Sequence, residues 1–256
     1  MKLLEVKEIT KEFGGLKAVD HVSLDVAEGE IVSVIGPNGA GKTTAFNLIT
    51  GIYKLDAGQV FFGGKEITNF SPRRIVRAGI SRTFQNIRLF GNLRVIENVL
   101  IGMHDDTRYN FADLLFRTPR FHRVEKERTE QAIQILKKIE LYDALDSYAS
   151  DLPYGSQRRL EIARAIATGA RLILLDEPAA GMNPQESEEL MRFVVRLRDE
   201  GFTILMIEHD MSIVMNISDR IYVMDYGKLI ASGTPREISV DPNVIRAYLG
   251  ESEDEA

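Results

Sequence analysis

The 256-residue sequence contains no cysteine and no tryptophan, and only 8 prolines. Without cysteine, the chain has no disulfide bond, no thiolate zinc site, no iron–sulfur cluster held by cysteines and no cysteine nucleophile. No stretch approaches the roughly 18 consecutive apolar residues that a membrane-spanning helix needs. The first ten residues, MKLLEVKEIT, include Glu5 and Glu8 and therefore lack the apolar core of a signal peptide. We expect a soluble, cytoplasmic protein from these absences.

Basic residues are fewer than acidic ones, at 32 against 38, which gives a net charge of −6. This balance is unfavourable for broad electrostatic binding of nucleic acid. The composition is 44% hydrophobic and 27% charged, which excludes a wholly disordered or collagen-like chain. At roughly 150 residues per domain, the length predicts one large domain or a core with an inserted lobe.

The hydrophobic pattern predicts strands and helices in alternation. Residues 1–30 alternate apolar and polar, which is typical of half-exposed strands. A mainly helical stretch at about 93–145 includes an amphipathic stripe formed by Ala132, Ile135, Leu136 and Ile139. Short apolar runs predict buried strands at 31–35, 172–175, 203–207 and 221–224. This order indicates a parallel β-sheet with crossover helices, interrupted by a helical lobe.

A glycine-rich segment follows the predicted strand at 31–35. It reads Gly36-Pro37-Asn38-Gly39-Ala40-Gly41-Lys42-Thr43-Thr44 and fits the phosphate-loop pattern G-x-x-x-x-G-K-[ST] between a strand and a helix. Backbone N–H groups of such a loop, together with the helix N-terminus, bind phosphate oxygens. Lys42 would bridge the β- and γ-phosphates, and the Thr43 hydroxyl would ligate Mg²⁺. The rival dinucleotide fingerprint, G-x-G-x-x-G, begins at Gly39 but fails at Thr44.

Two carboxylates, Asp176 and Glu177, end the predicted strand at 172–175. Open α/β sheets bind their ligands at the carboxyl ends of strands. Asp176 can hold Mg²⁺ through water, and Glu177 can orient the attacking water. Taken alone, such a pair is also common at the start of a helix. In the same chain as the phosphate loop, it predicts nucleotide hydrolysis.

In order and spacing, these motifs resemble the ATP-binding subunit of an ABC transporter over almost the whole chain. Phe13 fits the aromatic position that stacks on adenine, Gln85 fits the Q-loop, and His209 fits the switch histidine. Taken alone, these three would be a core aromatic, a surface amide and a structural histidine. The resemblance implies that ATP and Mg²⁺ are bound, with catalytic roles for Glu177, His209, Lys42 and Gln85 and metal contacts from Thr43, Gln85 and Asp176.

The segment from Leu152 departs from the family's signature, L-S-G-G-Q. Pro153 stands where the family has the serine that reaches the γ-phosphate of the opposite subunit, and proline has neither a hydroxyl nor a backbone N–H. The resemblance leaves Gly155, Ser156 and Gln157, at the start of the following helix, as the nucleotide contacts. A second departure is Asn183, which replaces the usual aspartate of the D-loop.

The resemblance also implies the fold class, α/β, with a P-loop NTPase (RecA-like) core, an N-terminal antiparallel β subdomain and an inserted α-helical subdomain. We expect the first part of the core at 1–90. The helical subdomain, ending in the signature segment, is expected at 91–155, and the second part of the core at 156–237. A C-terminal helix and an acidic tail would occupy 238–256.

The middle lobe carries a long insertion from Met103 to Glu125. Together with Tyr154-Gly155, the segment 178–184 and the segment 244–250, it resembles the LivG-like ATPases of branched-chain amino-acid importers. ATPases of amide or urea importers and of lipopolysaccharide export remain alternatives. The insertion itself is either a neutral surface excursion or a contact with a membrane subunit or with lipid headgroups.

The resemblance implies integral-membrane permease subunits and a second ATPase subunit, identical or related, as partners. It implies no nucleic acid, no direct contact with the solute, and a peripheral position on the cytoplasmic face of the inner (cell) membrane. Two other classes stay open: a soluble ABC ATPase that acts on DNA or ribosomes, and a nucleotide-binding regulator that does not hydrolyse ATP.

Overall fold

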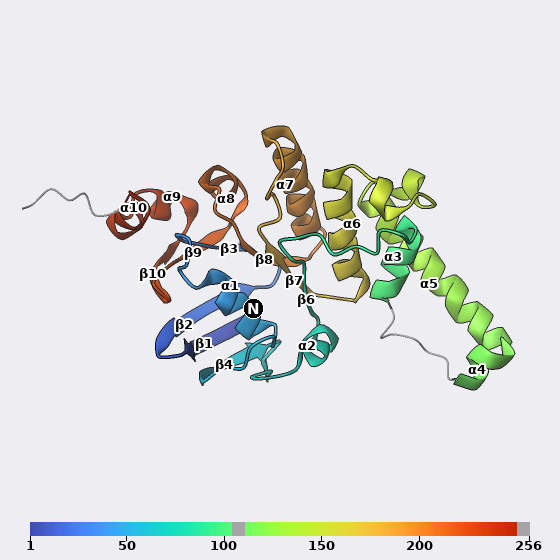
Figure 1. The fold of residues 1–256 in the computed structure, drawn as a ribbon, viewed down its shortest axis with the longest axis horizontal. Helices are drawn as coiled ribbons and strands as arrows, with labels where there is room; N and C mark the ends of the chain where they lie inside the picture. Colours follow the sequence, from blue (N-terminus) through green and yellow to red (C-terminus); the bar gives the residue numbers. More distant parts are fainter. Residues whose placement is uncertain (104–110, 250–256) are drawn as a thin grey trace, which may run out of the picture. The chain divides into compact units, whose positions relative to one another are not determined.

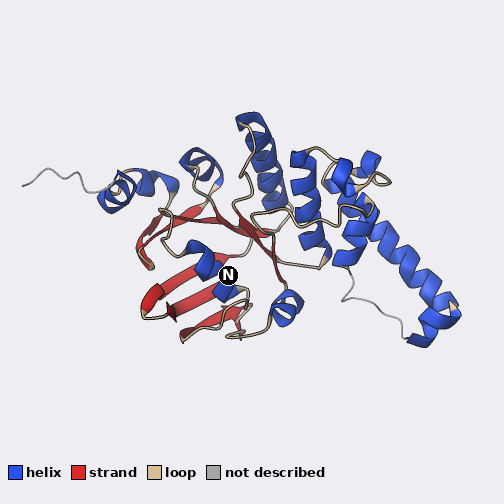
Figure 2. Ribbon diagram, in the orientation of Figure 1, coloured by secondary structure: helices blue, strands red, loops and turns tan. Residues whose placement is uncertain are grey.

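The computed structural model describes residues 1–103 and 111–249. These residues form two compact units, shown as ribbons in Figures 1 and 2. The first unit combines Met1–Arg82 with the chain from Arg171 onward, and the second is Thr83–Ala170. Part of the insertion considered above, at 104–110, and the acidic tail from residue 250 lie outside the described residues.

A four-stranded antiparallel sheet forms the N-terminal part of the first unit (Figure 2). Its order is β2-β1-β4-β5, with β1 at Lys2–Phe13, β2 at Leu16–Ala27, β4 at Ala57–Phe62 and β5 at Lys65–Glu66. In β2 the buried and exposed side chains alternate, because one face of the strand packs on the core. The structure thus confirms the expected antiparallel β subdomain and its half-exposed strands.

The second sheet of this unit has six strands in the order β10-β9-β3-β8-β7-β6. They are β3 at Ile31–Ile35, β6 at Ile80–Arg82, β7 at Leu172–Asp176, β8 at Thr203–Ile207, β9 at Arg220–Asp225 and β10 at Lys228–Gly233. All neighbours pair in parallel except β9 and β10. Every residue of β3, β7 and β8 is buried, as their unbroken apolar sequences predict.

The parallel register brings the carboxyl ends of three strands to one edge. Val34 of β3 and Asp176 of β7 both lie beside Ile207, the last residue of β8. The loops that follow these strands therefore start side by side, which is the ligand-binding position of open α/β sheets.

Six helices accompany these sheets in the described part of the first unit. They are α1 at Lys42–Ile49, α2 at Pro72–Ala78, α7 at Pro184–Asp199, α8 at Met211–Ile217, α9 at Pro235–Ser239 and α10 at Pro242–Leu249. Helix α1 shares one hydrophobic core with both sheets, through Phe46 and Leu48. Burying a phenylalanine or leucine stabilises a fold by about 1.5–3 kcal/mol, so this packing fixes α1 and the loop before it.

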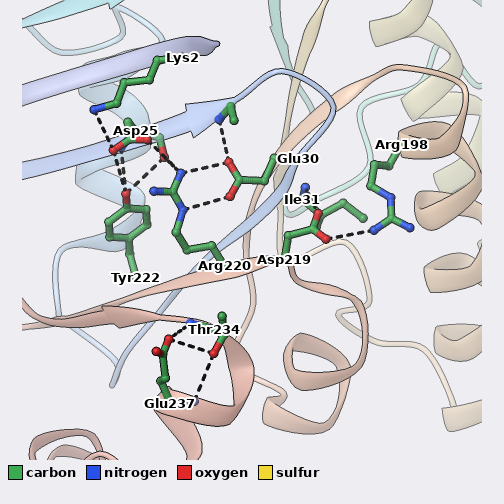
Figure 3. A network of polar contacts seen from close by, with 11 residues as sticks. Lys2, Asp25, Glu30, Ile31, Arg198, Asp219, Arg220, Tyr222, Thr234 and Glu237 are labelled. Atoms are coloured by element: carbon green, nitrogen blue, oxygen red, sulfur yellow. Dashed lines mark hydrogen bonds and ion pairs between the residues drawn. The ribbon is translucent and has the colours of Figure 1, made fainter.

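The opposite ends of the strands are held by a polar network around Arg220 (Figure 3). Its guanidinium donates to both carboxylate oxygens of Glu30, each at 3.0 Å, and to Oδ2 of Asp25, also at 3.0 Å. Next to it, Oδ2 of Asp219 accepts a hydrogen bond from the backbone N–H of Ile31 at 2.8 Å. Because β3 begins at Ile31 and β9 at Arg220, the network fixes the sheet at the edge away from the phosphate loop.

The second unit is helical throughout its described elements. It contains α3 at Val95–Gly102, α4 at Phe111–Phe116, α5 at Pro119–Lys138 and α6 at Tyr154–Ala167, with short 3₁₀ turns at Tyr142–Ala144 and Ala149–Asp151. The predicted stripe is buried where it faces the unit's core: Ala132, Leu136 and Ile139 are each 0% exposed. No helix in 1–103 or 111–249 combines the length and apolarity needed to cross a membrane.

The second unit includes the expected helical range 91–155 and extends beyond it on both sides. Helix α6 begins at Tyr154, directly after Pro153 at its N-cap, and it stays within this unit to its end. The signature segment and the helix that follows it are therefore one element of the helical unit, whereas the expected boundary at 155/156 divides them.

Candidate nucleotide site

The phosphate loop joins β3 to α1 and depends on two close backbone approaches. A Cβ atom on Gly36 would lie 2.0 Å from the carbonyl oxygen of Met224, and one on Gly41 would lie 2.3 Å from the carbonyl oxygen of Ala18. Both glycines also have positive φ, at 147° and 97°. No residue with a side chain fits these positions without moving the backbone, so the spacing of glycines in the motif is a packing requirement of this fold.

The N-terminus of α1 carries backbone donors that no acceptor among the described residues satisfies. Gly41 is the N-cap and has no side chain, and the first helical hydrogen bond runs from the N–H of Ala45 to the carbonyl oxygen of Gly41 at 2.9 Å. Within the described residues, no acceptor faces the N–H groups of Lys42, Thr43 and Thr44. Such a helix end, with its partial positive charge, fits an anion of the phosphate class.

The ammonium group of Lys42 lies against the same loop. Its Nζ donates to the carbonyl oxygens of Gly36 at 2.6 Å and Pro37 at 2.9 Å, and the residue is 7% exposed. Burial lowers the pKa of Lys42, and the negative charge of Glu177 opposes that shift. An ammonium has three donors, so it can exchange a carbonyl for a phosphate oxygen.

Glu177 and His209 lie at the same edge of the sheet as Lys42. Glu177 follows β7, and its backbone N–H donates to the carbonyl oxygen of Ile207 at 3.0 Å. Nδ1 of His209, two residues after β8, is 4.0 Å from Oε2 of Glu177. The structure thus brings together a buried cation, a carboxylate and an imidazole that the sequence places far apart.

Glu208 is a further site residue, which sequence reasoning missed. The side chain directly follows β8 and is 1% exposed. Its Oε1 accepts a hydrogen bond from the backbone N–H of Ala179 at 3.0 Å, and its Oε2 accepts one from the N–H of His209 at 3.3 Å. Burial raises the pKa of Glu208. In the sequence it is only an acid before a histidine, and nothing there indicates its partners.

Asp176, the predicted metal-binding carboxylate, forms a nearly buried ion pair. Its Oδ2 lies 2.6 Å from Nη2 of Arg82, and the two side chains are 7% and 6% exposed. Nη1 of Arg82 donates to Oδ1 of Asn47, on α1, at 2.6 Å. Arg82 was not predicted, because it stands 94 positions from its partner in the sequence.

The donor set suits Mg²⁺ shared between protein and phosphate. Among the residues described, no group of three or more histidine, aspartate or glutamate side chains could hold a metal ion. Mg²⁺ is commonly bound by one or two protein oxygens together with substrate phosphates and water, rather than by a cage of side chains. The Thr43 hydroxyl and the Asp176 carboxylate fit that pattern.

Phe13, the predicted adenine platform, ends β1 with its side chain open to solvent. The residue is 43% exposed, and its ring meets the ring of Tyr53 edge to face, with centroids 5.3 Å apart. An exposed aromatic face is suited to stacking on a base. Tyr248 of α10 is a second aromatic beside the site: burial raises its pKa, and the backbone N–H of Gly36 opposes that shift.

The other predicted residues, Gln85, Gly155, Ser156 and Gln157, belong to the second unit. The buried guanidinium of Arg158 donates to the carbonyl oxygens of Phe84 and Gln85, both at 2.7 Å, and to Oε2 of Glu161 at 2.8 Å. Arg158 therefore ties the Gln85 segment to α6. Gln85 itself is exposed to solvent.

The first turn of α6 is open at its N-terminus. Pro153 caps it without a side-chain hydrogen bond, and the N–H of Gln157 donates to the Pro153 carbonyl at 2.9 Å. In the described part of the chain, the N–H groups of Gly155 and Ser156 have no acceptor, and no atom lies within 4 Å of a Cβ built on Gly155. This helix end can therefore receive an anion without the family's serine.

Asn183, the second departure from the family pattern, is the N-cap of α7. Its Oδ1 accepts a hydrogen bond from the N–H of Glu186 at 3.0 Å, and the Glu186 carboxylate accepts one from the N–H of Asn183 at 3.0 Å. Asparagine and aspartate are comparable N-caps, so the replacement keeps the start of this helix.

Comparisons with known proteins show which families and relatives the chain is similar to. The model of the family described as ABC transporter matches residues 19–180, and that described as branched-chain amino acid ATP-binding cassette transporter matches residues 228–254. The chain is 48% identical to the high-affinity branched-chain amino acid transport ATP-binding protein BraF of Pseudomonas aeruginosa, over 98% of each chain. It is 47% identical to LivG of Escherichia coli, also over 98% of each.

Solved structures of ATP-binding cassettes are similar to this chain over most of its length. An ATP-binding cassette of an ABC transporter in its ADP conformation has a TM-score of 0.84 at 37% identity, covering 98% of this chain and 100% of that one. A dimeric ATP-binding cassette in a post-hydrolysis state, bound to ADP and phosphate, has a TM-score of 0.74 at 26% identity, covering 91% and 99%. Both the expected fold class and the resemblance are confirmed.

Proposed function

The chain belongs to the ABC transporter family of ATPases, and from this premise we propose that it is the ATP-hydrolysing subunit of an importer of branched-chain amino acids. The observation that carries the proposal is the joint placement of Lys42, Glu177 and His209 at the open end of α1. The proposed solute follows the relatives, whose names specify branched-chain amino acid transport.

Each residue of the site has its own role in ATP binding or hydrolysis. Phosphate oxygens of ATP bind the N–H groups at the start of α1, Lys42 spans the β- and γ-phosphates, and Phe13 stacks on adenine. Thr43 and Asp176 would hold Mg²⁺, which would neutralise charge on the same phosphates. Glu177 orients the attacking water, and His209 donates a hydrogen bond to the γ-phosphate.

A second ATPase subunit completes the proposed site. The N–H groups of Gly155 and Ser156, open at the start of α6, would receive the γ-phosphate bound by the partner subunit. Gln85, tied to the same helix through Arg158, would contact the Mg²⁺ and a cytoplasmic loop of the permease. The subunit would then work as a peripheral protein on the cytoplasmic face of the inner membrane, without touching the solute or nucleic acid.

Reconstitution tests the proposal. The chain is co-purified with its permease and second ATPase subunits, placed in proteoliposomes, and supplied with a binding protein and labelled leucine. We expect uptake of leucine that requires ATP, and inorganic phosphate released at a rate that rises with uptake. Uptake of urea or a short amide instead of leucine would assign the solute to another importer of this branch. Co-purification with ribosomal RNA and no permease would contradict the transport function.

A further inference from the structure

Glu177 has an unusual backbone conformation. Its φ is +45°, in the left-handed region that residues with side chains rarely adopt. Such a residue keeps its conformation only where the surrounding structure holds it, and this kind of strain is concentrated at active sites. The groups that hold the backbone on either side of Glu177 therefore decide where its carboxylate lies.

Two hydrogen bonds connect this backbone to the last residue of β8 and to the residue that follows it. On the near side, the N–H of Glu177 donates to the carbonyl oxygen of Ile207 at 3.0 Å. On the far side, the N–H of Ala179 donates to Oε1 of Glu208 at 3.0 Å. The first bond uses a backbone acceptor that any residue provides. The second depends on the identity of one side chain, Glu208.

The same carboxylate also holds the residue that bears the imidazole. Oε2 of Glu208 accepts a hydrogen bond from the N–H of His209 at 3.3 Å, while Nδ1 of His209 lies 3.9 Å from that oxygen. Glu208 is 1% exposed, so bulk water does not compete for its carboxylate oxygens. Retaining a buried carboxylate costs desolvation energy, which the two N–H groups offset.

We propose that Glu208 is a positioning residue for hydrolysis. Its carboxylate acts as a clamp that connects Ala179, in the loop after Glu177, to His209, and it thereby fixes the two catalytic side chains relative to each other. The inference rests on the proposed function, because it assigns Glu177 and His209 their catalytic roles. It predicts that loss of the clamp misplaces both groups while the phosphate loop still binds nucleotide, because the hydrogen bonds and the ion pair of Glu208 in the described structure go to Ala179 and His209.

Two variants separate the parts of the clamp. Glu208→Gln keeps one oxygen that can accept from Ala179, but its amide nitrogen then faces the N–H of His209. Glu208→Ala removes both acceptors. A displacement of about 1 Å costs roughly 100-fold in rate, so we expect kcat of the assembled transporter to fall about 100-fold in Glu208→Ala and less in Glu208→Gln. KM for ATP should stay within about twofold, because the contacts of the phosphate loop and Lys42 with the phosphates are unchanged.

A second measurement tests whether the clamp exists, and it does not require ATP hydrolysis. Amide hydrogen exchange of the metal-free chain should be faster at Ala179 in both variants than in the wild type, because this N–H has lost its charged acceptor. Glu237→Ala is the matched control: that carboxylate also accepts a backbone N–H, from Thr234 at 2.7 Å, but on the exposed helix α9. It should leave both kcat and exchange at Ala179 as in the wild type.

The outcomes distinguish the inference from the function on which it rests. Unchanged kcat together with faster exchange at Ala179 shows that the clamp exists but does not serve hydrolysis, and the inference is wrong. A loss of nucleotide affinity equal to the loss of kcat assigns Glu208 a general structural role and also overturns it. If Glu208→Ala does not fold, the same criteria apply to Glu208→Gln. Failure of the wild-type complex to hydrolyse bound ATP contradicts the proposed function itself.

Discussion

Arg82 donates a hydrogen bond from Nη2 to Oδ2 of Asp176 across 2.6 Å, and both side chains are almost completely buried. This ion pair uses one carboxylate oxygen of Asp176, so the other, Oδ1, can contact a water bound to Mg²⁺. Arg82 also reaches Asn47 of α1 at 2.6 Å. The planar guanidinium therefore connects the end of β6, the end of β7 and the phosphate-loop helix, a geometry that lysine cannot reproduce.

Removing this guanidinium should destabilise the protein strongly in the absence of metal. Arg82→Gln leaves the buried Asp176 carboxylate unpaired, and breaking a buried ion pair in this way costs about 3–5 kcal/mol. Urea unfolding in EDTA measures the loss. Arg171→Gln is the matched control, because Arg171 pairs with Glu28 at the same 2.6 Å but with both side chains more than half exposed. The control should lose less than about 1 kcal/mol, and equal losses would show that burial of the Arg82 pair is unimportant.

The first glycine of the phosphate loop should not tolerate alanine. A Cβ at Gly36 meets the Met224 carbonyl oxygen at 2.0 Å, so the loop or β9 must move. Overpacking of this kind costs about 1–3 kcal/mol, and the displaced loop should also bind nucleotide more weakly. Gly91→Ala is the comparison: its nearest contact, the Cβ of Ser150, is an ordinary 3.6 Å away. Thermal unfolding and binding of a fluorescent ATP analogue measure both effects, and similar results for the two variants would contradict the argument.

The pH dependence of stability should reveal the buried carboxyl of Glu208. Burial raises its pKa in the folded chain above the ordinary value of 4.5, so the folded state binds the proton more tightly than the unfolded state. Stability therefore decreases as the pH rises from about 4.5 through the folded pKa, and it is level above that. In Glu208→Gln this contribution disappears, and its free energy of unfolding should decrease less with pH than that of the wild type. A variant with the wild-type slope from pH 4.5 to 7.5 would exclude Glu208 as its source.

Local sequence predicts the parts of this site that are local in the chain. The phosphate loop has its glycines, lysine and threonine within nine consecutive residues, and their spacing reflects the contacts of Gly36 and Gly41 with neighbouring backbone. The central strands were predicted for a similar reason. A strand buried on both faces must be apolar throughout, and β3, β7 and β8 are.

The contacts of Arg82 and Glu208 with distant segments were not predicted, because they depend on the order of strands in the sheet. Arg82 meets Asp176 only because β6 pairs with β7, and β6 is three residues long, too short for a recognisable pattern. Glu208 meets Ala179 only because β7 and β8 are neighbours in parallel. The start of α6 is local in the chain and was expected near Gly155; in the structure the helix begins at Tyr154, with Pro153 as its N-cap.

Replacing Glu177 with glutamine tests its assignment as the residue that activates the attacking water. Glu177→Gln keeps the volume of the side chain and its place after β7, but glutamine cannot accept a proton from the attacking water. General-base catalysis contributes about 10²–10⁴-fold, so steady phosphate release by the assembled transporter should fall at least about 100-fold. Binding of ATP should persist, because the loop donors and Lys42 are unchanged. Glu189→Gln, at an exposed position of α7, should behave as the wild type. Undiminished turnover in Glu177→Gln would show that another residue is the general base. Glu208 would then position only one catalytic side chain, that of His209.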